Sequence, residues 1–135
     1  FHVVPGISAA NGVSSYAGIP LTHRDYAQSC TFVTGHMKDE NLMLEWQSLA
    51  KPNQTIVIYM GLLALSQISV ELIKHGAPKD LPIAVVEQGT TSQQRVVTGA
   101  LSNIAQKVKR EKLKSPSLII IGNVVQLRKK LNWFN

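Results

Sequence analysis

Two short runs in this sequence are apolar on both faces, and they restrict the fold more than any other feature. Residues 55–59 read Thr-Ile-Val-Ile-Tyr, and residues 118–121 read Leu-Ile-Ile-Ile. A half-buried strand alternates apolar and polar residues, whereas a continuous β-branched run is typical of a central strand covered by helices on both sides. The chain is therefore predicted to fold as an α/β protein with helices on both faces of a sheet.

The remaining elements predict a mixed sheet of about five strands. Strands are expected at residues 31–34, 55–60, 82–87, 95–98 and 117–121. Apolar spacings of three and four predict helices over residues 62–73 and 101–108, and a shorter one over 42–49. Lys74-His75-Gly76 gives the first of these a basic last turn and a glycine stop. Residues 87–95 are too few for a crossover helix, so the strands that they join are predicted to be antiparallel.

The N-terminal segment places small residues after a turn. Val3 and Val4 are predicted to end a strand at Pro5-Gly6. Proline fixes one backbone angle and glycine has no side chain, so Ser8 and Ala9 are expected to open a helix whose bare backbone faces a ligand. An ordinary strand-to-helix turn is the alternative interpretation.

Composition and charge bear on the partners and the location of the protein. The net charge of +6 suggests an anionic partner, but the basic clusters at 107–114 and 128–130 fall at or after the ends of helical patterns, where cations offset the helix dipole. We therefore expect solvated helix ends and no nucleic-acid partner. No apolar run approaches the ~20 residues that span a bilayer, so no membrane association is expected. The lone Cys30 fits a reducing cytoplasm.

The polar residues around Cys30 do not predict a metal site. His23, Asp25, Cys30 and His36 are ligand types, but their spacing matches no zinc or iron pattern. No Gly-x-Ser-x-Gly motif or paired Cys-His context predicts a catalytic nucleophile either. No metal is expected, and no catalytic residue is assigned.

Short blocks along almost the whole chain carry a family resemblance. They are Val3-Val4-Pro5-Gly6-Ile7-Ser8-Ala9-Ala10, Tyr16-Ala17-Gly18-Ile19-Pro20-Leu21-Thr22-His23-Arg24-Asp25-Tyr26-Ala27-Gln28-Ser29, Phe32-Val33-Thr34-Gly35-His36, Tyr59-Met60-Gly61, Val86-Glu87-Gln88-Gly89-Thr90, Ser117-Leu118-Ile119-Ile120-Ile121-Gly122 and Leu131-Asn132-Trp133-Phe134. In order and spacing they resemble the uroporphyrinogen-III C-methyltransferases, members of the tetrapyrrole methylase family that form the C-terminal part of siroheme synthase in many bacteria. The resemblance implies the C-terminal subdomain of the tetrapyrrole methylase fold for residues 1–135.

Motifs that open this family are missing. The family begins with a strand and a G-x-G-P-G-D turn, followed by an aspartate assigned to catalysis and a G-G-D-P loop. None of the nine glycines forms a G-x-G here. We therefore expect the chain to be the C-terminal half of the methyltransferase unit. Its expected partner is the missing N-terminal half of the same protein, and the chain is expected to be inactive alone.

The resemblance implies S-adenosylmethionine as methyl donor, with S-adenosylhomocysteine as product. It assigns Ser8, Ala9, Met60 and Gly89 to this cofactor. Three of these four residues also have a purely structural interpretation. Ser8 could be a helix N-cap, Met60 could fill the core and Gly89 could be a turn glycine.

The implied substrate is a tetrapyrrole with many carboxylates, which is converted to a precorrin for siroheme or cobalamin. Arg24 is the first candidate to hold a carboxylate, because its planar fork forms two bonds, and His23 and His36 are the others. The alternatives are an ion pair of Arg24 with Asp25, Asp39 or Glu40, and buried structural histidines. The resemblance also implies a cytoplasmic homodimer. Another precorrin or diphthamide-pathway methyltransferase, and a non-catalytic binding module, are the alternative functions.

Overall fold

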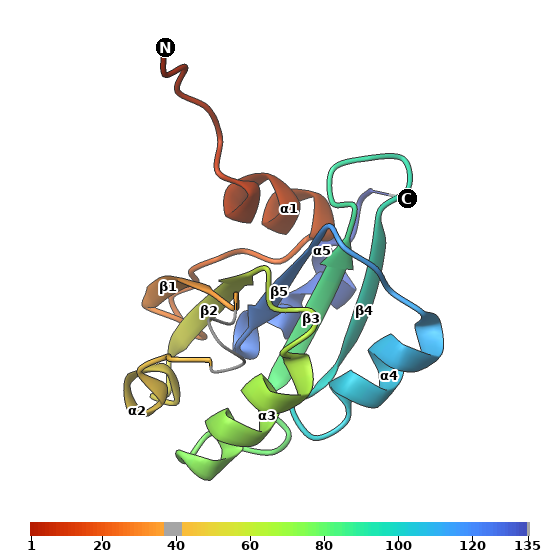
Figure 1. Cartoon of the computed structure of the whole chain (residues 1–135). Coiled ribbons are helices and arrows are strands. Elements are labelled where there is room, and N and C mark those ends of the chain that lie inside the picture. The colour runs from red at the N-terminus through yellow and green to blue at the C-terminus, as the bar shows by residue number, and fades with distance from the viewer. Residues whose placement is uncertain (37–41, 135) are drawn as a thin grey trace.

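A five-stranded sheet lies between two layers of helices in the computed structural model, which describes residues 1–36 and 42–134 (Figure 1). The strands follow one another across the sheet in the order β1-β2-β5-β3-β4. Their bounds are β1 Ser29–Thr34, β2 Gln54–Tyr59, β3 Pro82–Glu87, β4 Arg95–Ala100 and β5 Ser117–Ile121. The helices are α1 Ala9–Ala17, α2 Trp46–Leu49, α3 Leu65–Lys74, α4 Ile104–Glu111, the 3-10 helix η1 Asn123–Leu127 and α5 Arg128–Leu131.

The sheet is mixed, as predicted. Strand β1 is parallel to β2, whereas β5 is antiparallel to both β2 and β3. Strand β4 is antiparallel to β3, which confirms the prediction for the short connection at residues 87–95. Because β5 runs against its two neighbours, the carboxyl ends of β1, β2 and β3 lie at one edge of the sheet, where β5 begins.

Side chains on the two faces of the sheet form two separate core clusters. On β2, Ile56 and Ile58 face the layer of α2, α3 and α4, and Val57 faces α1 on the opposite side. On that second face, the small residues Ala10 and Ala17 let α1 approach the sheet closely. Strands β2 and β5 are buried on both faces, as their apolar runs predict, and β3 is a third strand of this kind.

The helices are shorter than the predicted segments or shifted along the chain. The helix predicted over 62–73 begins at Leu65, the one over 101–108 lies at Ile104–Glu111, and only Trp46–Leu49 of 42–49 is helical. The basic cluster 107–114 covers the last turn of α4, and residues 128–130 lie in the last turn of the short helix α5, so both clusters fall at helix ends as predicted. Within the described part of the chain, no helix is long and apolar enough to cross a membrane.

The predicted strand at Val3 and Val4 is wrong. Residues 1–8 carry no regular structure and extend away from α1 (Figure 1). Val3, Val4 and Ile7 are more than 80% exposed, at 82%, 85% and 83%. A strand needs a neighbouring strand to satisfy its backbone groups, and none of the described strands lies beside this segment.

Candidate functional site

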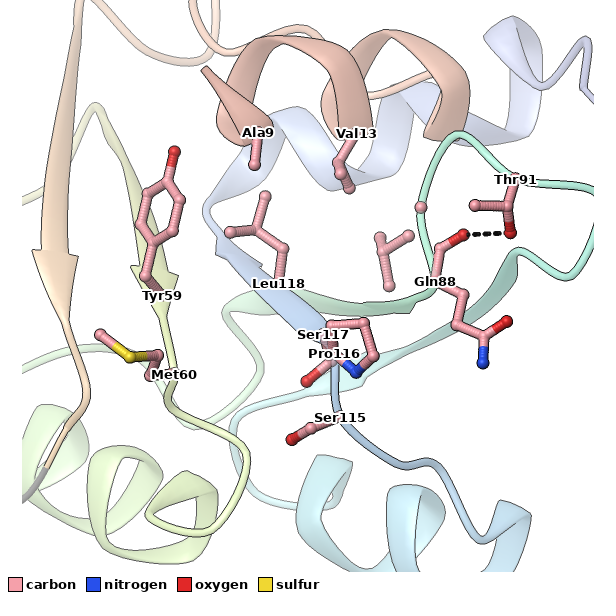
Figure 2. Close-up of a pocket in the computed structure, with 12 residues that line it drawn as sticks. Ala9, Val13, Tyr59, Met60, Gln88, Thr91, Ser115, Pro116, Ser117 and Leu118 are labelled. Atoms are coloured by element: carbon pink, nitrogen blue, oxygen red, sulfur yellow. Dashed lines mark hydrogen bonds between the residues drawn. The ribbon is translucent and has the colours of Figure 1, made fainter. Parts of the chain in front are cut away.

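A cleft of about 690 Å³ opens at the sheet edge where β2 and β3 end and β5 begins. The pairing register explains its position, because Tyr59 lies opposite Leu118 and Glu87 lies opposite Ser117. Helix α1 covers one side of the opening (Figure 2). The α1 cleft, as we call it, is lined by Ala9, Val13, Tyr59, Met60, Val86, Gln88, Gly89, Thr91, Ser115, Pro116, Ser117 and Leu118.

The backbone turns sharply where β2 and β3 reach the α1 cleft. Met60 has φ of 52° and Gln88 has φ of 46°, both in the left-handed region. This conformation costs a residue with a side chain about 1–2 kcal/mol, and such strained residues cluster at functional sites. Two non-glycine residues hold it at the ends of β2 and β3, two parallel strands that lie on either side of β5, which identifies this edge as the candidate site.

The hydroxyl of Tyr59 ties the start of α1 to the end of β2. It shares a hydrogen bond of 2.6 Å with Ser8 Oγ and accepts one of 2.9 Å from the backbone N–H of Ala10. Ser8 Oγ also accepts from the Ala10 N–H at 3.3 Å, so Ser8 is the N-cap of α1. The structure therefore places Ser8 at the helix start, beside the α1 cleft but not among its lining residues.

Gly89 allows the β3–β4 loop to lie against α1. A Cβ atom on Gly89 would lie 2.6 Å from Val13 Cγ2, closer than carbon atoms approach in real structures. The loop is also held by Thr91, whose hydroxyl donates to the Gln88 carbonyl at 2.8 Å (Figure 2), and by Gln94, whose side-chain amide donates to the Tyr16 carbonyl. Close approach, rather than turn geometry, explains the glycine.

Met60 is not core filler, because 64% of the residue is exposed. Its side chain lies on the lower side of the α1 cleft in Figure 2, on the same strand end as Tyr59. An exposed thioether at the mouth of a cleft is available for contact with a ligand.

The predicted substrate residues are separated by the length of β1. His23 and Arg24 precede β1, at the edge of the sheet opposite the α1 cleft, whereas His36 follows β1 at the same edge as the cleft. A six-residue strand spans roughly 17–20 Å. The structure therefore brings His36 to the cleft side of the sheet and leaves His23 and Arg24 at the other side.

The contacts of Arg24, His23 and His36 bear on the alternative roles, an ion pair for Arg24 and a buried structural role for the histidines. The Asp25 carboxylate lies 3.8 Å from His23 Nδ1, and among the described residues Arg24 forms no ion pair. Asp39 and Glu40 lie outside the described residues. His23 is half-buried, and its ring Nδ1 accepts a hydrogen bond from the backbone N–H of Asp25. His36 is exposed, and its backbone N–H donates to Thr34 Oγ1.

A buried carboxylate directly before Gln88 was not predicted. Glu87 is 6% exposed; Oε1 accepts from the backbone N–H of Lys114 at 2.7 Å, and Oε2 accepts from Arg95 Nη1 at 3.2 Å. Arg95 also donates to the Glu111 carbonyl at 2.8 Å. One carboxylate thus joins the end of β3, the start of β4 and the approach to β5 behind the α1 cleft. The sequence does contain a signal for this ion pair. Glu87 ends β3, and Arg95, directly opposite it, begins β4.

In residues 1–36 and 42–134, the His, Cys, Asp and Glu side chains form no group of three that could hold a metal ion. Burial raises the pKa of the Cys30 thiol, which favours its protonated form at neutral pH.

Tyr59, Gln88 and the segment 115–117 line the α1 cleft, although the sequence alone did not assign them to a site.

Comparison with curated proteins relates the chain to siroheme synthases. It is 63% identical over 134 residues to the siroheme synthase of Methylobacillus flagellatus and 59% identical over 135 residues to that of Nitrosomonas eutropha. These matches cover 99% and 100% of the chain but 29% and 28% of the relatives. The chain thus spans less than a third of the length of the curated relatives that it matches.

Solved structures of methyltransferases share the fold. A uroporphyrin-III C-methyltransferase from Thermus thermophilus matches with a TM-score of 0.76 and 32% identity, over 97% of this chain and 55% of that one. Another structure of that enzyme, complexed with S-adenosylhomocysteine, matches at 29% identity and a TM-score of 0.76, over 93% and 53%. A cobalt-precorrin-4 methyltransferase has a TM-score of 0.81 at 20% identity, over 92% and 52%, which shows the fold alone.

The family profile described as tetrapyrrole (corrin/porphyrin) methylases matches residues 1–105, most of the chain. The mixed sheet agrees with the fold of these neighbours, and the sequence resemblance is confirmed. The chain therefore belongs to the tetrapyrrole methylase family.

Proposed function

We propose that this chain supplies the S-adenosylmethionine-binding part of a uroporphyrinogen-III C-methyltransferase that serves siroheme formation. The observation that carries the proposal is the α1 cleft, which is lined by Ala9, Met60 and Gly89. The family resemblance assigns these residues and Ser8 to the cofactor. Ser8 is the N-cap of α1, the helix that begins at Ala9 and covers one side of the cleft. The Thermus thermophilus relative complexed with S-adenosylhomocysteine supports the same ligand class.

The α1 cleft fits the proposed cofactor in size and chemistry. Its volume of about 690 Å³ falls within the usual range for small-molecule pockets. Val13, Val86 and Leu118 offer apolar surface for the carbon parts of the molecule, while Gln88 and Thr91 offer polar atoms. Apolar walls with a few polar groups suit a ligand that combines an adenosine with a charged sulfonium.

S-adenosylmethionine, when bound, supplies a methyl group whose bond to sulfur breaks as a new bond to a tetrapyrrole carbon forms. For such a displacement, holding the reacting groups in line is a large part of catalysis. In this chain, Tyr59 fixes the start of α1, and Gly89 lets the β3–β4 loop close against Val13. The proposed role of these residues is therefore to position the donor and to exclude water on the α1 side.

The substrate proposal extends to the basic residues. His36, at the cleft edge of the sheet, is the first candidate for contact with a tetrapyrrole carboxylate. Arg24 and His23 lie at the opposite edge, so their role requires a substrate or partner surface that reaches around β1. By resemblance, the proposal includes a cytoplasmic homodimer in which residues 1–135 form the C-terminal subdomain and an N-terminal subdomain completes the cleft. The relatives' greater length supports the second subdomain.

Other methyltransferases of this fold are weaker candidates. The cobalt-precorrin-4 methyltransferase is 20% identical and a diphthine synthase is 15% identical with a TM-score of 0.54. The uroporphyrin-III enzyme reaches 32%, and the siroheme synthases exceed 55%. The ordering of identities favours the uroporphyrinogen substrate.

Replacing Met60 with alanine is expected to weaken S-adenosylhomocysteine binding about fivefold, because roughly half of a methionine's burial energy is lost with the side chain. Stability should change by less than about 0.5 kcal/mol, since the residue is exposed. Met43→Ala is the matched control, because Met43 is 90% exposed and does not line the α1 cleft. Calorimetric titration of the chain measures both affinities. Equal affinities for the two variants, or no binding by the unmodified chain, would contradict the proposed site.

A further inference from the structure

A second cavity lies between α3 and α4, on the opposite face of the sheet from α1. It has a volume of about 710 Å³. Leu62, Leu65 and Val108 give it an apolar floor, and Lys109, Lys112 and Lys114 supply its cations. We call it the α3–α4 groove. An apolar floor with a positive rim is suited to a ligand that is itself apolar in the middle and anionic at its periphery.

The three lysines are available to an outside anion. All three are exposed, and none forms an ion pair with an acid in residues 1–36 or 42–134. Glu111 is the only acidic residue of α4, and its carboxylate lies near Arg95 and Arg110 instead. The charge of Glu111 is therefore already balanced by arginines that do not line the groove.

Lys112 occupies a backbone position that glycine would adopt more easily. It is the C-cap of α4, with φ of 53° in the left-handed region. Glycine is the usual residue at such helix ends, because any side chain is strained there. The position lets us remove the Lys112 side chain while relieving strain rather than adding it.

The α3–α4 groove adjoins the α1 cleft along two stretches of backbone. Lys114 lines the groove and the next residue, Ser115, lines the cleft. Met60 lines the cleft and Leu62 lines the groove, with only Gly61 between them. Consecutive Cα atoms are about 3.8 Å apart, so at both places a residue that lines the groove lies within about 8 Å along the backbone of one that lines the cleft. Met60 and Ser115, the cleft residues at these two places, lie on the lower side of Figure 2.

We propose that the α3–α4 groove binds peripheral carboxylates of the tetrapyrrole substrate while the reacting carbon faces the α1 cleft. This inference rests on the proposed function, and it adds a binding site that the family resemblance does not assign. A macrocycle with several carboxylates has the required pattern of an apolar centre and anionic rim. Lys109, Lys112 and Lys114 would hold the carboxylates, and Leu62 would contact the ring.

The test uses uroporphyrin III, a stable fluorescent octacarboxylate, titrated into the chain at fixed salt. Replacing Lys109, Lys112 and Lys114 together with glutamine should weaken binding about tenfold, since each exposed ion pair contributes roughly two- to fivefold. The control replaces Lys51, Lys79 and Lys130, which lie outside the α3–α4 groove, and removes the same charge. Lys112→Gly alone should weaken binding about threefold without lowering the melting temperature.

The outcomes separate this proposal from the proposed function. Weaker uroporphyrin binding in the groove variants only, with S-adenosylhomocysteine affinity unchanged, supports the groove. Equal loss in the control triple variant indicates general charge attraction and overturns it. If the chain binds S-adenosylhomocysteine but not uroporphyrin III, the groove proposal fails and the donor site stands. If uroporphyrin III binds through the lysines but S-adenosylhomocysteine does not bind, the donor site fails and the groove stands.

Discussion

Gly89→Ala is expected to weaken S-adenosylhomocysteine binding at least tenfold and to lower the free energy of unfolding by about 1–3 kcal/mol, the usual cost of overpacking. The added Cβ would lie 2.6 Å from Val13 Cγ2 and 2.9 Å from Cγ1. Valine has little freedom at χ1, so rotation of Val13 cannot relieve the contact. Either α1 or the β3–β4 loop must move, and both line the α1 cleft. Thermal denaturation and calorimetric titration measure the two effects.

A second substitution distinguishes displacement of α1 from a general defect. Val13→Ala removes both methyl groups that the new Cβ would meet. The double variant Gly89→Ala, Val13→Ala should therefore bind more tightly than Gly89→Ala alone. Val13→Ala by itself supplies the fourth corner of the cycle. Additive losses in the double variant would show that the contact between Gly89 and Val13 does not shape the site.

Arg95→Met is expected to lower the free energy of unfolding by about 2 kcal/mol, because it leaves the buried carboxylate of Glu87 without its cation. Glu87 is 6% exposed, and Arg95 is the cation that lies 3.2 Å from it. The side chain of Arg95 is 47% exposed, so the expected loss is below the range for fully buried pairs. Chemical denaturation gives the value. Arg110→Met is the control, because Arg110 is 74% exposed and contacts only the carboxylate of Glu111 among the described acids.

The neutral variant Glu87→Gln tests whether the buried charge is the cause. Its side-chain oxygen keeps an acceptor for the Lys114 N–H, whose hydrogen bond to Glu87 is 2.7 Å long. In the Glu87→Gln background, Arg95→Met should cost about half as much as in the unmodified chain. An equal cost in both backgrounds would mean that Arg95 stabilises the chain through its bond to the Glu111 carbonyl instead.

Much of the sheet follows from the sequence. The runs at 55–59 and 118–121 become the central strands β2 and β5, because a strand buried on both faces needs apolar side chains at every position. The short connection at 87–95 fixes the antiparallel pair β3–β4 for a geometric reason. Val3 and Val4 misled because strand propensity is local, whereas a strand forms only beside a partner.

The candidate site was less predictable. Met60 and Gly89 were assigned through family resemblance, but their physical reasons lie in backbone conformation and in contact with Val13, which no local pattern reveals. Tyr59 reads as one more apolar strand residue, although its hydroxyl holds α1 across 49 residues of chain. Arg24 and His36 are close in the sequence, yet β1 separates them. Such relationships depend on how distant elements meet.

The central claim is that this chain forms part of a methyltransferase acting on a tetrapyrrole. The most direct measurement places the chain in the Nitrosomonas eutropha siroheme synthase, replacing the 135 residues that match it at 59% identity. Transfer of labelled methyl from S-adenosylmethionine to uroporphyrinogen III is then followed. The account predicts methyl transfer by this hybrid protein and its marked reduction by Gly89→Ala in the inserted chain. A folded hybrid that binds S-adenosylhomocysteine but transfers no methyl group would contradict it.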